Sequence, residues 1–149
     1  MLENLHQTPS PTGFVVANDM DVKRAYMLTH QARRFNSPCL FVTNHDARFF
    51  PNLKKDKQNI KFDRIACDVP CSGDGTLRKN LGLWKRWDEH YGHGHHPMQL
   101  DILKRGFALL KKGGRLVYST CSFNPIENEA VVAAALTEWQ GRIELVDVS

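Results

Sequence analysis

The 149-residue sequence contains no long hydrophobic run. Its longest uninterrupted apolar stretch extends from Ala130 to Leu136, well short of the roughly 20 residues that a membrane-spanning helix requires. The N-terminal stretch MLENLHQTPSPTG also lacks the apolar segment of a secretory signal. We therefore expect an intracellular, soluble protein.

Cysteine is scarce and shows no metal-binding or disulfide pattern. The four cysteines form no CxxC pair, and in a reducing compartment they should remain thiols. Histidines gather from His90 to His96, but their spacing fits no established ligand motif, so a solvated loop is the favoured interpretation. We expect free thiols and no metal site.

Acidic residues are outnumbered by basic ones. The sequence has 20 Lys and Arg against 16 Asp and Glu, and its formal net charge is +4. Basic pairs such as Lys54-Lys55 and Lys85-Arg86 favour polyanionic partners. Because most basic clusters are simply solvated surface, charge alone favours nucleic-acid binding only weakly.

Short apolar runs alternate with helical patterns along the chain. Consecutive apolar residues predict strands buried on both faces, as in a parallel sheet, at Phe14 to Ala17, Leu40 to Thr43, Ile65 to Cys67 and Leu116 to Ser119. A last short strand is expected at Ile143 to Val146. Strands that alternate with helices predict an α/β fold, a doubly wound, mostly parallel sheet.

Three helices are expected between these strands. The first carries the apolar stripe Ala25, Leu28, Ala32 and Phe35. The second runs from Pro97 to Lys112 and stops at Gly113-Gly114. The third starts with Asn124 as its cap and Glu127 completing a capping box, and its core stripe is Val132, Ala135, Leu136 and Trp139. The stretch from Ser72 to His96 is predicted to be a long functional loop.

Acids and thiols follow the ends of the predicted strands. Asp19 follows the first strand, Asp46 the second, Asp68 ends the third before Cys71, and Cys121 follows the fourth. Ligands of open α/β sheets lie beyond the carboxyl ends of the strands, so we expect these residues to converge. Acids after adjacent strands suit ribose hydroxyls and a base. Aspartate is also a common cap or turn former, and that alternative stays open for each acid.

The two pairs of cysteines have different surroundings. Cys39 and Cys67 lie in or beside apolar strands and are expected to be small core residues. Cys71 and Cys121 lie beyond strand ends among polar neighbours, where a thiol can act as a nucleophile if its pKa is lowered. The segment FVVANDMD has no glycine, so the phosphate-cradling turn of a dinucleotide fold is absent there.

Three motifs resemble those of a known family. DVPCSGDGT, MQLDILKRGFALLKKGG and GGRLVYSTCSFNPIENEAVV are similar to the Sun-domain, or RsmB/Nop-type, RNA cytosine-5 methyltransferases, which use S-adenosylmethionine. ANDMDVKR, LRKN and LWKRW most resemble the eukaryotic tRNA-directed branch. The resemblance implies a sheet of the class I methyltransferase type, S-adenosylmethionine as cofactor, and RNA, specifically tRNA, as substrate in the nucleus or cytoplasm, with neither metal nor membrane.

The resemblance also implies roles for the residues at the strand ends. Carbon 5 of cytosine is a weak nucleophile, so a thiolate first adds to carbon 6, which is the role of Cys121. Cys71 assists release of the product. Asp68 contacts the cytosine edge and the methyl-transfer region, Asp46 the adenine side of the cofactor, and Asp19 its ribose hydroxyls.

The long loop offers contacts for a target base that leaves its stack. Its basic residues are expected to meet phosphates, and its aromatic residues either stack on bases or pack down. The basic candidates are Lys79, Lys85 and Arg86, and the aromatic ones are Trp84, Trp87 and Tyr91.

The sequence departs from the family at both ends. The glycine-rich cofactor loop and its strand should precede Phe14, and that strand lies centrally, between the first and third strands seen here. The last strands of the sheet are also missing. We therefore expect residues 1–149 to form one partial catalytic domain that lacks its central and last strands, with an irregular segment at 1–12.

Three other functions remain open. The chain is alternatively a non-catalytic RNA-binding or assembly fragment of such an enzyme. A DNA cytosine methyltransferase also uses a Pro-Cys thiol, but the Thr-Cys-Ser motif at Cys121 argues against it. An amino-group methyltransferase is weaker, because Asp-Val-Pro-Cys only loosely resembles its acid-Pro-Pro-aromatic pattern.

Overall fold

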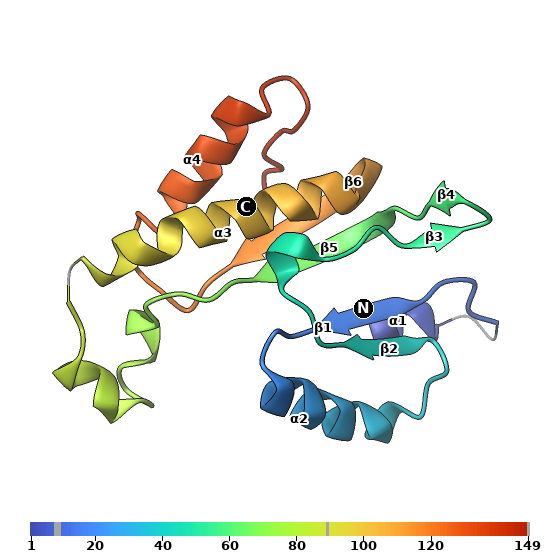
Figure 1. Cartoon of the computed structure of the whole chain (residues 1–149), viewed down its shortest axis with the longest axis horizontal. Helices are drawn as coiled ribbons and strands as arrows, with labels where there is room; N and C mark the ends of the chain where they lie inside the picture. The colour runs from blue at the N-terminus through green and yellow to red at the C-terminus, as the bar shows by residue number, and fades with distance from the viewer. Residues whose placement is uncertain (8–9, 89, 149) are drawn as a thin grey trace. The chain divides into compact units, whose positions relative to one another are not determined.

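A computed structural model describes residues 1–7, 10–88 and 90–148 of the chain (Figure 1). They form two compact units, Met1–Phe50 and Pro51–Ser149, where the sequence predicts one domain. Thr8 and Pro9 of the segment predicted to be irregular, and Glu89 of the predicted loop, lie outside the described residues. Within the described parts, no helix combines the length and the apolar character that crossing a membrane demands.

The first unit is built around one parallel pair of strands. β1 pairs with β2 in register from Val15↔Leu40 to Asn18↔Thr43, as the apolar runs predict. Asp21 caps the intervening helix by accepting a hydrogen bond from the Arg24 amide at 2.8 Å. The elements of this unit are α1 (Leu2–Leu5), β1 (Val15–Asn18), α2 (Val22–Ala32), the 3₁₀ turn η1 (Arg33–Phe35), β2 (Leu40–Thr43) and the 3₁₀ turn η2 (Ala47–Phe49). A single helical turn, α1, thus lies within the segment predicted to be irregular.

The second unit holds another parallel pair with two helices. β5 pairs with β6, in register from Arg64↔Arg115 to Asp68↔Ser119. The hairpin β3–β4, which the sequence analysis does not predict, precedes this pair. The elements are β3 (Lys54–Lys55), β4 (Gln58–Asn59), β5 (Phe62–Asp68), the 3₁₀ turns η3 (Asp74–Thr76) and η4 (Leu81–Lys85), α3 (Tyr91–Leu109), β6 (Leu110–Ser119) and α4 (Glu129–Glu138).

The core of the second unit lies between α3, α4 and the β5–β6 pair. Leu103, Val131 and Ala135 form its buried cluster, and Leu116 and Ile143 pack against it. α3 lies along the strands, as Figure 1 shows. Gly106 makes this packing possible, because a Cβ there would lie 2.7 Å from Leu116 Cδ1 and 3.2 Å from Cys67 Sγ.

The strands are less buried than their apolar sequences predict. Phe41 is 54% exposed and Val117 is 62% exposed, so the expectation of two covered faces is wrong for these strands. In the second unit α3 covers the face that carries Leu116 and Cys67. Among the described residues the three sheets have two strands each, with the orders β1–β2, β3–β4 and β5–β6.

Both ends of the second predicted helix are wrong. α3 begins at Tyr91, so Pro97 lies inside it and not at its start. It ends at Leu109, and β6 begins at once. The register shifts from Phe62↔Leu110 to Arg64↔Arg115, which places the glycine pair in a bulge. The φ of 76° at Gly113 therefore serves this bulge and not a helix end.

The third predicted helix starts late, and the last predicted strand is wrong. α4 begins at Glu129, because the preceding residues form turns in which the Asn124 side chain accepts from the Ile126 amide at 3.0 Å. Val131, next to the predicted Val132, is the fully buried residue. Residues 143–146 form no strand; Ile143 packs on the core instead.

Candidate active site

Two neighbouring strands bring Cys71 and Cys121 together. β5 and β6 are parallel and end side by side, with Asp68 opposite Ser119, and the Val69 amide donates to the Ser119 carbonyl at 3.1 Å. The loops that follow therefore leave the same edge of the sheet. The Sγ atoms of Cys71 and Cys121 lie 3.2 Å apart. The predicted convergence holds for this pair of thiols.

A glycine fixes the distance between the two loops. The Gly75 amide donates to the Cys121 carbonyl at 2.9 Å, and the Phe123 amide donates to Asp74 Oδ1 at 2.8 Å. A Cβ built on Gly75 would lie only 2.6 Å from that same Cys121 oxygen. Any other residue there must push the loops apart.

We expect Gly75→Ala to lower the free energy of unfolding by about 1–3 kcal/mol, the usual cost of forcing extra atoms into a packed site. Gly94→Ala is the matched control, because a Cβ at Gly94, on the same unit, meets no atom within 4 Å. Alanine is a better helix former than glycine, so the control should gain up to about 1 kcal/mol. Urea unfolding measures both changes. Equal stabilities of the two variants would contradict the close approach at Gly75.

The thiols line one pocket of about 290 Å³. This volume is at the lower end of the roughly 300–1,000 Å³ that is common for ligand pockets. Ser72, Gly73 and Thr76 from the first thiol loop contribute to its wall. The pocket is therefore large enough for a small organic group.

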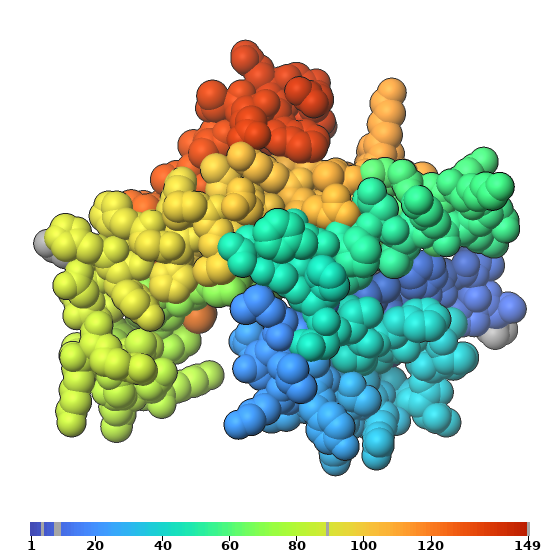
Figure 2. Space-filling model, in the orientation of Figure 1, coloured from blue at the N-terminus to red at the C-terminus, as the bar shows by residue number. Residues whose placement is uncertain are grey.

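The predicted loop residues divide between pocket and surface. Arg86, Trp87 and Tyr91 line the pocket with the thiols. Trp84 instead donates its indole N–H to the Leu77 carbonyl at 3.2 Å and stays 67% exposed. Lys79 and Lys85 are also exposed. In Figure 2 this segment, coloured yellow-green, forms a surface projection of the second unit.

The half-buried thiol of Cys71 and the buried thiol of Cys67 are poor acids. Burial, together with the hydrogen bond with Cys121, raises the pKa of Cys71 to about 11. Burial also raises the pKa of Cys67 to about 11, in agreement with its predicted role as a core residue. Cys39 is only partly buried, and all four cysteines are free thiols. At neutral pH Cys71 therefore keeps its proton.

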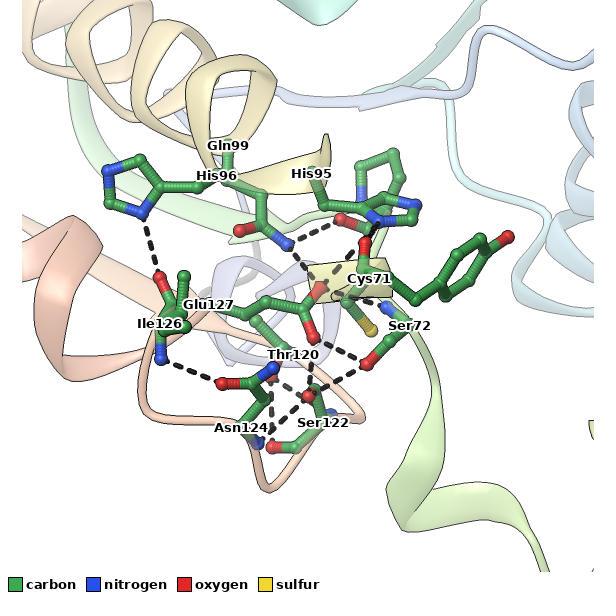
Figure 3. A network of polar contacts seen from close by, with 12 residues as sticks. Cys71, Ser72, His95, His96, Gln99, Thr120, Ser122, Asn124, Ile126 and Glu127 are labelled. Carbon is green, nitrogen blue, oxygen red and sulfur yellow. Dashed lines mark hydrogen bonds and ion pairs between the residues drawn. The ribbon is translucent and has the colours of Figure 1, made fainter. Parts of the chain in front are cut away.

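A buried carboxylate, Glu127, lies beneath both thiol loops (Figure 3). It accepts from the Ser72 amide at 2.8 Å, from the Ser122 hydroxyl at 2.6 Å, from Gln99 Nε2 at 3.0 Å, and from the Ser72 hydroxyl. Its exposed fraction is 0%. Burial raises the pKa of Glu127, but these hydrogen bonds together outweigh burial and lower it below its ordinary value.

Sequence reasoning missed this role of Glu127 by assigning it to a capping box. Its carboxylate makes no hydrogen bond to the Asn124 amide, which instead donates to Ser122 Oγ at 3.0 Å. One sequence signal was available. Each of the thiols Cys71 and Cys121 is followed directly by a serine, and both serines reach the same carboxylate.

Three histidines of the group from His90 to His96 lie in α3, namely His93, His95 and His96, so the solvated loop predicted for this group is wrong. His96 Nδ1 donates to the Ile126 carbonyl at 2.8 Å, and His95 Nδ1 donates to the Tyr91 carbonyl at 3.0 Å. The helix starts at Tyr91 and carries these side chains toward the turn before α4. The described residues hold no group of three or more side chains placed to bind a metal ion.

Asp19 and Asp46 lie in the first unit, at the carboxyl edge of β1–β2. Asp19 Oδ1 accepts from the Asp21 amide at 2.8 Å and pairs with Arg24 at 3.0 Å. Asp46 caps η2, and hydrogen bonds from the Arg48 side chain to both of its oxygens lower its pKa. The alternative role as turn former or cap is thus realised for both acids. Asp68, in the second unit, ends β5 with an exposed side chain.

Comparisons with known proteins show the family to which the chain is related. The family profile of the 16S rRNA methyltransferase RsmB/F matches residues 3–148. The chain is 58% identical over 154 residues to the multisite-specific tRNA:(cytosine-C(5))-methyltransferase of Saccharomyces cerevisiae, an alignment that covers 99% of this chain and 22% of the relative. It is 54% identical over 156 residues to the tRNA (cytosine(34)-C(5))-methyltransferase of Drosophila melanogaster, covering 99% and 21%.

Solved structures show the same fold. NSun6 from Pyrococcus horikoshii with SFG superposes with a TM-score of 0.71 and 27% identity, covering 85% of this chain and 31% of that one. A methyltransferase homologue from the same organism gives a TM-score of 0.62 and 30% identity, covering 84% and 37%. These matches confirm the predicted α/β fold of the methyltransferase type. The chain spans about a fifth of the length of the curated relatives above, and by its sequence and fold it belongs to the RsmB/F family of RNA methyltransferases.

Proposed function

We propose that the chain carries the thiol pair of a tRNA (cytosine-5) methyltransferase, which transfers a methyl group from S-adenosylmethionine to carbon 5 of cytosine through a covalent cysteine adduct. The observation that carries this proposal is the pair Cys71 and Cys121, 3.2 Å apart at one sheet edge and lining one pocket. Relatives named as tRNA (cytosine-5) methyltransferases support it. They do not favour a non-catalytic fragment.

The two thiols take different parts in the reaction. Cys121 is exposed, and its sulfur adds to carbon 6 of the base, which makes carbon 5 nucleophilic. Cys71 holds its proton, and from 3.2 Å its S–H can donate to the Cys121 sulfur. This hydrogen bond stabilises the Cys121 thiolate before attack and again when the thiolate is expelled, while solvent water accepts the proton that leaves carbon 5.

S-adenosylmethionine, when bound, supplies an electrophilic methyl group for carbon 5. The Asp19 carboxylate in the first unit fits the ribose of this cofactor. Both contacts of Asp19 use Oδ1, so Oδ2 can accept hydrogen bonds from ribose hydroxyls. Asp46 lies at the same edge and is proposed for the adenine side, with Arg48 holding its carboxylate in place. The solved NSun6 structure with SFG, an S-adenosylmethionine analogue, supports this choice of cofactor.

The pocket in the second unit is proposed to take a cytosine extruded from its stack. Trp87 and Tyr91 are exposed rings on its wall and suit stacking, and Arg86 beside them suits a flanking phosphate. Asp68, directly before the Val-Pro-Cys turn, is proposed to contact the cytosine edge. For a tRNA substrate we propose the nucleus or cytoplasm as the place of the reaction, without a metal or a membrane.

Methyl transfer to tRNA tests this function. The chain is incubated with methyl-labelled S-adenosylmethionine and unmodified tRNA transcripts, and the product is digested to nucleosides. We expect the label in 5-methylcytidine, and much less of it with Asp68→Asn. RNA binding that weakens with salt but brings no label would contradict catalysis by this chain. Label on the amino group of cytosine would contradict the use of the thiols.

A further inference from the structure

We propose that Glu127 is a positioning residue that holds the sulfurs of Cys71 and Cys121 side by side. The inference rests on the proposed function for its catalytic meaning, but the contacts it concerns can be tested on this chain without RNA or cofactor. Three of the four hydrogen bonds that Glu127 accepts come from Ser72 and Ser122. These two residues directly follow the two thiols in the sequence.

On the Cys71 side, two hydrogen bonds connect Ser72 with the Glu127 carboxylate. Ser72 is 4% exposed and gives Glu127 both its amide and its hydroxyl proton. Gln99, from α3, donates to the Pro70 carbonyl at 2.8 Å and to Glu127 Oε1 at 3.0 Å. The residues before and after Cys71 are thus both tied to this carboxylate, directly or through one amide.

On the Cys121 side, one hydrogen bond connects Ser122 with the Glu127 carboxylate. Ser122 reaches Glu127 only through its hydroxyl, at 2.6 Å. The two serine oxygens also lie 3.0 Å from each other, so one carboxylate oxygen, Oε2, joins the two loops. The backbone of Glu127 is also anchored, because the Tyr118 hydroxyl donates to the Glu127 main-chain carbonyl at 2.6 Å.

Shape, and not charge, is the property that this role requires. The four hydrogen bonds that the carboxylate accepts come from neutral donors, an amide, two hydroxyls and a carboxamide, whereas His95 Nδ1 lies 3.9 Å from Oε1, beyond hydrogen-bond distance. A glutamine at this position has nearly the same outline. Its oxygen can accept from the Ser72 amide and Gln99, and its NH₂ can donate to serine hydroxyls, which rotate to accept. Alanine leaves every one of these donors without its partner.

A dithiol reagent measures the spacing without RNA or cofactor. Phenylarsine oxide condenses with two thiols to give one dithioarsenite and one water, and it does so efficiently only when the sulfurs are close together. Peptide mapping by mass spectrometry locates the bridge, iodoacetamide measures each thiol separately, and circular dichroism reports the fold. We expect the 149-residue chain to form a Cys71–Cys121 bridge.

Substitutions of Glu127 separate position from charge. Glu127→Gln should retain bridging within about twofold, and Glu127→Ala should lose at least tenfold while single-thiol alkylation persists. Thr137→Ala, on the exposed side of α4, is the control and should match the original chain. If Glu127→Ala fails to fold, bridging in the two serine variants tests the proposal instead. Ser122→Ala removes the single link and should lower bridging more than Ser72→Ala, which keeps the amide bond.

Some outcomes overturn the proposal. Unchanged bridging in folded Glu127→Ala, or in both serine variants, would mean that other contacts hold the thiols. Loss of bridging in folded Glu127→Gln would assign the effect to charge and refute positioning by shape. Failure of the proposed function gives a different pattern: bridging follows the predictions above, but no variant, nor the original chain, methylates tRNA.

Discussion

Replacement of Cys121 by alanine is expected to abolish covalent capture of RNA and to lower methyl transfer by roughly 10³-fold or more, as with other enzymes that lose their nucleophile. Cys121 is the exposed sulfur of the pair, and without it no atom of the chain attacks carbon 6. Single-turnover transfer to tRNA measures the rate. Denaturing gels with 5-fluorocytosine-containing tRNA detect the adduct, because fluorine at carbon 5 blocks its release.

Cys71→Ala should behave differently. The adduct forms, but its release slows, by about 10²–10⁴-fold if Cys71 acts through its proton. Stable protein–RNA adducts should therefore accumulate on ordinary tRNA. Cys39→Ser, in the first unit, is the matched control and should leave capture unchanged. If Cys71→Ala abolished capture and Cys121→Ala retained it, the two roles would be reversed, as in the DNA cytosine methyltransferase alternative.

Removal of the Glu127 side chain is expected to lower the free energy of unfolding by at least about 1–3 kcal/mol, the cost of leaving a buried donor without its acceptor. The side chain is fully buried, and its loss leaves the Ser72 amide without its acceptor and removes one hydrogen bond from each of the Ser72, Ser122 and Gln99 side chains. Urea unfolding of Glu127→Ala measures the change. A loss below 1 kcal/mol would contradict the network.

The same network predicts a dependence on pH. The pKa of Glu127 is lower in the folded chain than its ordinary value, so the unfolded chain binds more protons between the two values. The stability that this carboxylate supplies is present in full above the unfolded pKa of about 4.3 and is lost as pH falls through the folded pKa. Asp46, with Arg48, contributes in the same direction. Glu127→Gln should make the free energy of unfolding less dependent on pH on the acid side. An unchanged slope would contradict the lowered pKa of Glu127.

Local patterns in the sequence predicted much of the fold. The apolar run Leu40 to Thr43 coincides with β2, and the pairing of β5 with β6 follows from two apolar segments joined by a helical one. Boundaries depended on tertiary contacts that the patterns do not contain. Pro97 and Gly113 favour helix ends locally, but the packing of α3 on the strands and a bulge in β6 override them.

The sequence predicted that Cys71 and Cys121 lie close together, but it did not predict the contacts that support them. The position of Cys71 and Cys121 after neighbouring parallel strands follows from topology, which a sequence can indicate. The support depends on contacts between residues far apart in the chain, such as Ser72 with Glu127 and Gly75 with Cys121. No periodicity or spacing predicts these contacts. For Asp19 and Asp46 the sequence left two roles open, and their local hydrogen bonds are compatible with both.

The most direct test of the central claim is to map the residue that is bonded to RNA. The chain is incubated with S-adenosylmethionine and 5-fluorocytosine-containing tRNA, the adduct is digested with protease and nuclease, and the modified peptide is sequenced by mass spectrometry. Our account predicts a methylated 5-fluorocytosine joined through carbon 6 to Cys121, in the peptide that contains Ser-Thr-Cys-Ser. An adduct on Cys71, or a folded chain that forms none, would contradict it.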